Sequence, residues 1–108
     1  MVLKKLKQVN NPTVVQAGPL TEFVASLFAV AGMSAAHATE SAEVLVDADL
    51  NGIDTHGVCY NLDLHYLTGL LDGYINSRPE CTVVHETPST ALVDGDQGVG
   101  MISGRYGM

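Results

Sequence analysis

Apolar residues recur every three or four positions between residues 20 and 31, which predicts an amphipathic helix. We expect this helix to open at Gly18-Pro19, because proline is tolerated in a first turn, and to end at Gly32. Residues 1–18 lack such a period, so we expect an irregular N-terminal arm at 1–18 and a folded domain over 19–108. The predicted core-facing stripe of the helix is Leu20, Phe23, Val24, Leu27, Phe28 and Ala31.

Two more helices are predicted after Gly32. Ser34 is a suitable N-cap for a helix over residues 35–49, whose apolar stripe is Ala38, Ala42, Leu45, Val46 and Ala48. Asn51-Gly52 signals a turn, and a third helix over 58–72 would end at Gly73. Its apolar face is Leu62, Tyr66 and Leu70, with Leu67 and Leu71 beside it.

The pattern changes after residue 80. Two short β-like runs, at 81–86 and 90–95, are separated by Pro88, and a glycine-rich connection then leads into another element. The sequence therefore predicts an α/β fold in which N-terminal helices are followed by strands.

Composition narrows the class of protein. The chain has 108 residues, 46% of them apolar, and a net charge of −7, so it is a single domain rather than a disordered acidic segment. Five basic residues against twelve acidic ones argue against a nucleic-acid-binding face.

The predicted cellular compartment depends on whether the first 38 residues are a secretory signal. Lys4–Lys7, an apolar run over 23–33 and "AAHA" at 35–38 imitate a secretory signal, which would release a domain starting at Thr39. The basic residues lie more than a dozen positions from the apolar run, and that run is shorter than the roughly 20 residues that span a bilayer. We therefore expect a cytoplasmic protein that does not enter a membrane. Cys59 and Cys81 would then be free thiols, although their spacing leaves one disulfide open.

The stretch "DLNGIDTHGVCY", residues 49–60, contains the best catalytic candidate. An imidazole titrates near neutrality, so His56 could donate and recover a proton, with Asp54 available to orient it. On spacing alone, a Thr-His-Gly loop is more often structural than catalytic.

Other candidate sites are weaker. His56 and Cys59 could share a metal ion, but His65, Cys81 and His85 complete no recognisable zinc spacing, so no metal is expected. The glycines of "GDQGVG" at 95–100 stand in the reverse order of a dinucleotide-binding fingerprint and favour a turn. Asp47 and Asp49 are expected on different sides of their helix, which excludes a catalytic dyad.

Residues 42–58, "AEVLVDADLNGIDTHGV", resemble the malate/L-lactate dehydrogenase family, whose pattern runs AE-x-L-V-x-AD-x-RG-x-x-SHG. The stretches "LTEFVASLFAVAGM", "YLTGLLDGYIN" and "ALVDGDQGVG" are similar to other family segments in the same order. The resemblance covers residues 20–108. The family includes ureidoglycolate and diketogulonate oxidoreductases and is distinct from the Rossmann-type lactate and malate dehydrogenases.

The resemblance implies reversible hydride transfer between NAD or NADP and a 2-keto or 2-hydroxy acid, in a non-Rossmann fold whose subunits form homodimers. His56 corresponds to the family's proton-donating or substrate-binding histidine. Thr55 and Gly57 would shape the substrate pocket, and Tyr66 matches the family's tyrosine on the following helix. No residue of this chain is implied in cofactor binding.

Two departures from the family pattern qualify this expectation. Tyr60 stands where the family has an arginine for the substrate carboxylate, with His65 or Asn61 as possible substitutes, and the segment before Tyr66 is about two residues longer than the usual spacing. The family's nicotinamide-binding segment and a second histidine used as a base in some members have no counterpart. We therefore expect an N-terminal fragment that binds cofactor weakly or not at all. The alternative is a truncated inactive relic or a small helical interaction module.

Overall fold

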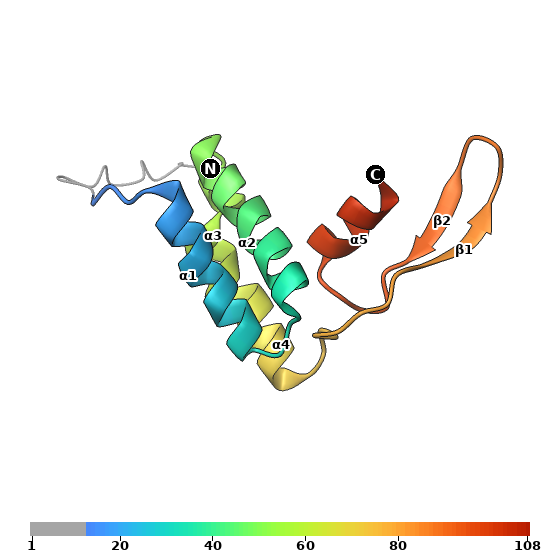
Figure 1. Ribbon diagram of the computed structural model, residues 1–108, viewed down its shortest axis with the longest axis horizontal. Coiled ribbons are helices and arrows are strands. Elements are labelled where there is room, and N and C mark those ends of the chain that lie inside the picture. The colour runs from blue at the N-terminus through green and yellow to red at the C-terminus, as the bar shows by residue number, and fades with distance from the viewer. Residues whose placement is uncertain (1–12) are drawn as a thin grey trace, which may run out of the picture.

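The computed structural model describes residues 13–108, in which helices are followed by a two-stranded sheet and a last helix (Figure 1). Residues 1–12 of the predicted N-terminal arm lie outside the described part. The elements, in chain order, are α1 (Ala17–Val30), α2 (Ala35–Leu50), the 3₁₀ turn η1 (Asp54–His56), α3 (Val58–Asn61), the π-helical segment η2 (Leu62–Leu67), α4 (Thr68–Asp72), β1 (Thr82–Glu86), β2 (Ala91–Asp94) and α5 (Gly100–Gly107).

Helix α1 begins at Ala17, so Pro19 lies in its first turn, and the chain reverses after it at Gly32, whose φ is +109°. Val24 and Phe28 are fully buried, as predicted. The prediction was wrong for Phe23, whose side chain is 60% exposed. Phe23 lies about 100° around the helix from Val24, and α1 buries only a narrow stripe, against α2 and the helical segment that follows α2.

Helix α2 agrees closely with the sequence pattern. The Ser34 hydroxyl accepts a hydrogen bond from the backbone N–H of His37 at 3.3 Å, which confirms the predicted N-cap. Its buried stripe contains the predicted Ala38, Ala42, Leu45 and Val46, and Ala48 is half-buried. This stripe packs against α1 and forms the centre of the hydrophobic core.

The third predicted helix is helical throughout but is not a single α-helix. Between α3 and α4 the chain widens into the π-helical segment η2, where the Thr68 hydroxyl donates to the carbonyl of Asp63, five residues back, at 2.8 Å. Leu62 and Leu70 are buried, while Leu71 is 70% exposed. Gly73, with φ +85°, ends the helix as predicted.

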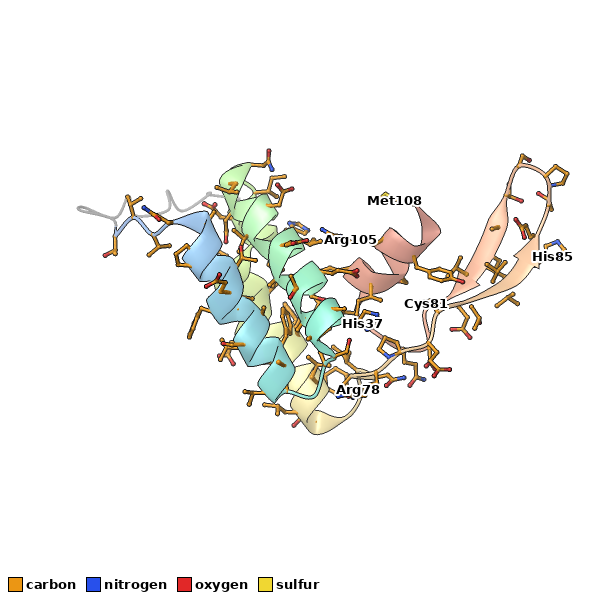
Figure 2. The ribbon with its side chains drawn as sticks, viewed as in Figure 1. His37, Arg78, Cys81, His85, Arg105 and Met108 are labelled. Carbon is orange, nitrogen blue, oxygen red and sulfur yellow. The ribbon has the colours of Figure 1, made fainter. Side chains whose placement is uncertain are left out.

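The two predicted strands form an antiparallel hairpin that projects away from the helices, with α5 between it and α2 (Figure 1). A bulge lies between Val83 and His85, and every residue of β1 is exposed to solvent. Helix α5 returns to the core through Ile102, and Arg105 binds Glu43 of α2 at 3.1 Å (Figure 2). Among residues 13–108, no helix is long and apolar enough to cross a membrane.

Candidate functional site

The predicted catalytic histidine lies in a short ordered connection between α2 and α3. Gly52, with φ +72°, completes the predicted turn, and the backbone N–H of Ile53 donates to the carbonyl of Ala48 at 2.8 Å. The N–H of His56 donates to the carbonyl of Ile53 at 2.9 Å. Backbone hydrogen bonds therefore fix the path of residues 51–57, which we call the His56 loop.

The side chain of His56 is exposed and is held by its neighbour. Thr55 Oγ1 lies 2.9 Å from His56 Nδ1, so the hydroxyl either donates to or accepts from this ring nitrogen. Among residues 13–108, Nε2 of His56 has no hydrogen-bond partner. The ring is thus held at one nitrogen and free to exchange a proton at the other.

Gly57 is buried directly after this histidine. Its φ of −89° and ψ of −166° are open to any residue, so the glycine is not required by backbone conformation. A Cβ at this position would instead overlap the carboxylate of Asp49. Gly57 therefore permits a close approach between the His56 loop and the last turn of α2.

The side chain that Gly57 admits belongs to Asp49, which the sequence analysis considered only as a member of a catalytic dyad and excluded. Its Oδ2 accepts a hydrogen bond from the backbone N–H of Val58 at 2.9 Å. The partner lies nine positions along the chain, beyond any helical repeat. The Ala-Asp pair in the quoted family pattern was the one signal that could have drawn attention to this residue.

Asn61 braces the loop from α3. Its Nδ2 donates to the carbonyl of Thr55 at 2.9 Å, so this amide is already engaged rather than free to replace the family arginine. Tyr60, at the arginine position, is 49% exposed, and His65 is also exposed.

Tyr66 occupies a different environment from the loop residues. Its ring packs edge-to-face against Phe28 of α1, with ring centroids 6.4 Å apart and planes at 61°. Within residues 13–108 its hydroxyl makes no hydrogen bond with Thr55, His56 or Gly57. The structure thus places Thr55, His56 and Gly57 together with Asp49, and places Tyr66 at the edge of the core. A substrate-binding role for Tyr66 stays a prediction.

A cavity of about 360 Å³ adjoins the His56 loop and is mainly apolar. Asp49, Val58 and Cys59 line it on the loop side. The other lining residues are Val15, Ala17, Leu20, Val46 and Leu50. His56 does not line the cavity. The exposed side chain of His56 therefore lies outside this cavity.

The remaining candidate groups do not converge. His37 lies near α5 while His85 extends from the hairpin, far from the helices (Figure 2). No group of three or more histidine, cysteine or acidic residues in the described part of the chain could hold a metal ion. Cys59 and Cys81 are free thiols, as expected.

The glycine-rich stretch 95–100 forms the predicted turn, closed by a hydrogen bond of 3.0 Å from the N–H of Gly98 to the carbonyl of Gly95. A Cβ at Gly98 would lie 2.5 Å from Cγ of Pro79, and one at Gly95 would lie 3.0 Å from Cβ of Ser103. The chain's own side chains therefore fill the space over these two glycines. They do not leave the open cradle that a dinucleotide phosphate needs.

Comparison with known proteins places these features in a family. A sequence model described as "Malate/L-lactate dehydrogenase" matches residues 15–108. The chain is 43% identical over 68 residues to L-sulfolactate dehydrogenase of Methanocaldococcus jannaschii, covering 63% of this chain and 19% of that protein. It is 36% identical over 89 residues to a malate dehydrogenase of Pyrococcus horikoshii, covering 82% and 24%. It is 30% identical over 89 residues to ureidoglycolate dehydrogenase (NAD(+)) of Escherichia coli, covering 82% and 25%.

Solved structures agree with the sequence matches. The malate dehydrogenase of Pyrococcus horikoshii superposes with a TM-score of 0.79 at 36% identity, covering 85% of this chain and 26% of that one. The malate dehydrogenase of Entamoeba histolytica gives 0.79 at 29% identity, covering 86% and 26%. These likenesses confirm the predicted fold class. The chain spans about a fifth to a quarter of the length of the curated relatives it matches.

Proposed function

Because the chain belongs to the malate/L-lactate dehydrogenase family, we propose that it is the N-terminal part of an enzyme that transfers hydride between NAD(P)H and a 2-keto acid. The observation that carries this proposal is the held, exposed imidazole of His56, with Nδ1 against Thr55 Oγ1 and Nε2 unpartnered among the described residues. The relatives' names include malate, sulfolactate and ureidoglycolate dehydrogenases, which supports a small 2-hydroxy acid as the substrate class.

The chemistry assigned to His56 follows from the charge that develops during reduction. As hydride reaches the keto carbon, the carbonyl oxygen becomes an alkoxide and requires a proton. A protonated His56 donates that proton from Nε2, while Nδ1–H donates to Thr55 Oγ1. The ring is then left neutral with its remaining proton on Nδ1. In the oxidation direction the same nitrogen accepts the hydroxyl proton.

The bound nicotinamide would supply the hydride, and we propose that its site lies mainly in other segments of the enzyme. Of the three glycines in the 95–100 stretch, Gly95 and Gly98 are packed against Ser103 and Pro79, and Gly100 is open among the described residues. We therefore assign to this chain the handling of a proton, and cofactor binding to other parts of the enzyme. We also propose that the enzyme is a cytoplasmic homodimer. Its cofactor is either NAD or NADP.

The test is turnover by the complete product of the gene that encodes this chain. Oxidation of NADH and NADPH is followed with the 2-keto acids that correspond to malate, lactate and sulfolactate. His56→Ala should lower kcat by about a hundredfold or more, the usual contribution of a general acid. His85→Ala is the matched control, since His85 is an exposed histidine on the hairpin, away from the His56 loop (Figure 2), and should retain activity. Full activity in the His56 variant would refute the assignment.

The alternative, an inactive relic or helical interaction module, is favoured by Tyr60 at the arginine position and by the prior engagement of Asn61. A well-folded gene product without turnover on any of these acids would support it. Titration of NADH into the isolated 108-residue chain gives an independent check, because tight binding would contradict the assignment of the cofactor site to other segments.

A further inference from the structure

We propose that Asp49 is the positioning residue that holds the His56 loop in place. Asp49 lies in the last turn of α2, and its carboxylate reaches the first residue of α3, where Oδ2 accepts from the N–H of Val58 at 2.9 Å. This hydrogen bond joins the two ends of the segment that contains His56. This role of Asp49 rests on the proposed function of His56. The hydrogen bond itself can be tested without an activity assay.

The contact separates Asp49 from the other acid of the same helical turn. Asp47 is exposed and its carboxylate makes no hydrogen bond among residues 13–108, whereas Asp49 is half-buried. A hydrogen bond from a backbone N–H to an ionised carboxylate is stronger than one between neutral groups. Asp49 therefore provides a directed, charge-assisted anchor, and Asp47 a matched acid without one.

Close packing adds a second constraint at the same point. Because a Cβ at Gly57 would overlap the Asp49 carboxylate, the loop backbone lies directly against that carboxylate immediately after His56. A second side chain, Asn61, also holds the loop, since its Nδ2 donates to the carbonyl of Thr55 at 2.9 Å. Asn61 thus holds the peptide just before His56, and Asp49 holds the Gly57–Val58 peptide just beyond it, from two different helices. Neither touches the imidazole, so Asp49 acts through the backbone.

The role requires an acceptor oxygen of the right length at position 49, and the negative charge strengthens the hydrogen bond that this oxygen accepts. Asp49→Asn keeps an acceptor oxygen and the side-chain size, and Asp49→Ala removes both. Asp47→Ala removes an equal charge from the same helix without touching the loop. The three variants therefore separate anchoring from charge and from a general loss of helix stability.

Amide hydrogen exchange of the 108-residue chain, followed by NMR, reads the anchor directly. The Val58 amide should exchange about tenfold faster or more in Asp49→Ala, relative to the amide of Leu45 in the core of α2. It should rise much less in Asp49→Asn, which keeps an acceptor oxygen, and stay near the parent rate in Asp47→Ala. Unchanged Val58 exchange in Asp49→Ala, or equal acceleration at Leu45, would overturn the proposal.

Turnover by the complete gene product supplies the functional readout. Asp49→Ala should lower kcat by about tenfold to a hundredfold with the KM for the nicotinamide cofactor unchanged, as expected when a reacting group is displaced slightly. Asp49→Asn should restore most of the loss. Parent-like kcat in Asp49→Ala would overturn the positioning role. An inactive parent enzyme together with the predicted exchange pattern would instead refute the proposed function and leave the anchor established.

Discussion

Replacement of Gly57 by alanine tests the packing of the His56 loop most directly. The backbone at Gly57 has φ −89° and ψ −166°, which alanine adopts without strain, so the conformational term should be small. The added Cβ would overlap the Asp49 carboxylate, which must move away and lose its hydrogen bond to the N–H of Val58. A hydrogen bond that involves a charged group contributes about 1.5–3 kcal/mol, and we expect a loss of that size in the free energy of unfolding.

Urea unfolding of the 108-residue chain measures this loss, followed by far-ultraviolet circular dichroism. With a slope of about 1–2 kcal/mol/M, the midpoint of Gly57→Ala should fall by roughly 1 M or more. Gly18→Ala is the control: outside its own helical turn, no atom of residues 13–108 lies within 4 Å of a Cβ there, so alanine should leave stability unchanged or raise it slightly.

A double-mutant cycle identifies the cause of the loss. In an Asp49→Ala background the carboxylate is absent, so Gly57→Ala should cost much less than it does in the parent chain. Equal costs in the two backgrounds would show that Gly57 is required for a reason other than Asp49. A Gly57→Ala chain as stable as the parent would refute the packing argument altogether.

Two local features give further predictions. Gln97 has φ +56°, a conformation that is unfavourable for a residue with a Cβ, so Gln97→Gly should raise the free energy of unfolding by about 1 kcal/mol in the same urea assay. A decrease would show that the Gln97 side chain offsets the strain. Ser34→Ala removes the hydroxyl that accepts from the N–H of His37 and should cost about 1 kcal/mol. Ser89→Ala, at an exposed hairpin position, should cost much less, and equal costs would mean that the cap is not the cause.

Features set by short-range rules were predicted from the sequence. Gly32, Ser34 and Gly73 end or begin helices because each supplies a backbone conformation or a cap within one turn. The two strands and the turn after them follow from equally local signals. Phe23 was misplaced because a periodic pattern does not state how wide a stripe the neighbouring helices will cover.

Features that depend on distant contacts were missed. The contact between Asp49 and Val58 spans a turn, a 3₁₀ segment and a glycine, so no helical or strand period relates the two residues. Gly57 was assigned to the substrate pocket by resemblance, and its contact with Asp49 is visible only once the loop path is known. The π-helical segment over Leu62–Leu67 was likewise predicted as ordinary helix, because its apolar spacing fits either form.

The departures from the family pattern lie close to the residues that hold the His56 loop. Whether these departures disturb the loop matters for the proposed activity. Tyr60 and the lengthened segment alter residues 60–67, where η2 takes a π-helical path that keeps Leu62 buried and Tyr66 against Phe28. A π-helical turn can accommodate extra residues while the flanking helix keeps its face. Extra residues accommodated in this segment would leave the path of the His56 loop unchanged.

The His56 loop itself keeps three side-chain anchors, from Asp49, Thr55 and Asn61, each with a hydrogen bond of 2.9 Å. The bonds from Asp49 and Asn61 fix the backbone before and after an exposed imidazole, which is not part of the hydrophobic core. A fixed backbone of this kind is what the proposed role of His56 as a proton donor requires. In the proposed enzyme, proton donation would depend on His56, and the residue at position 60 would affect how the substrate carboxylate is held. Tyr60→Arg should therefore change the KM for the keto acid and leave kcat little altered.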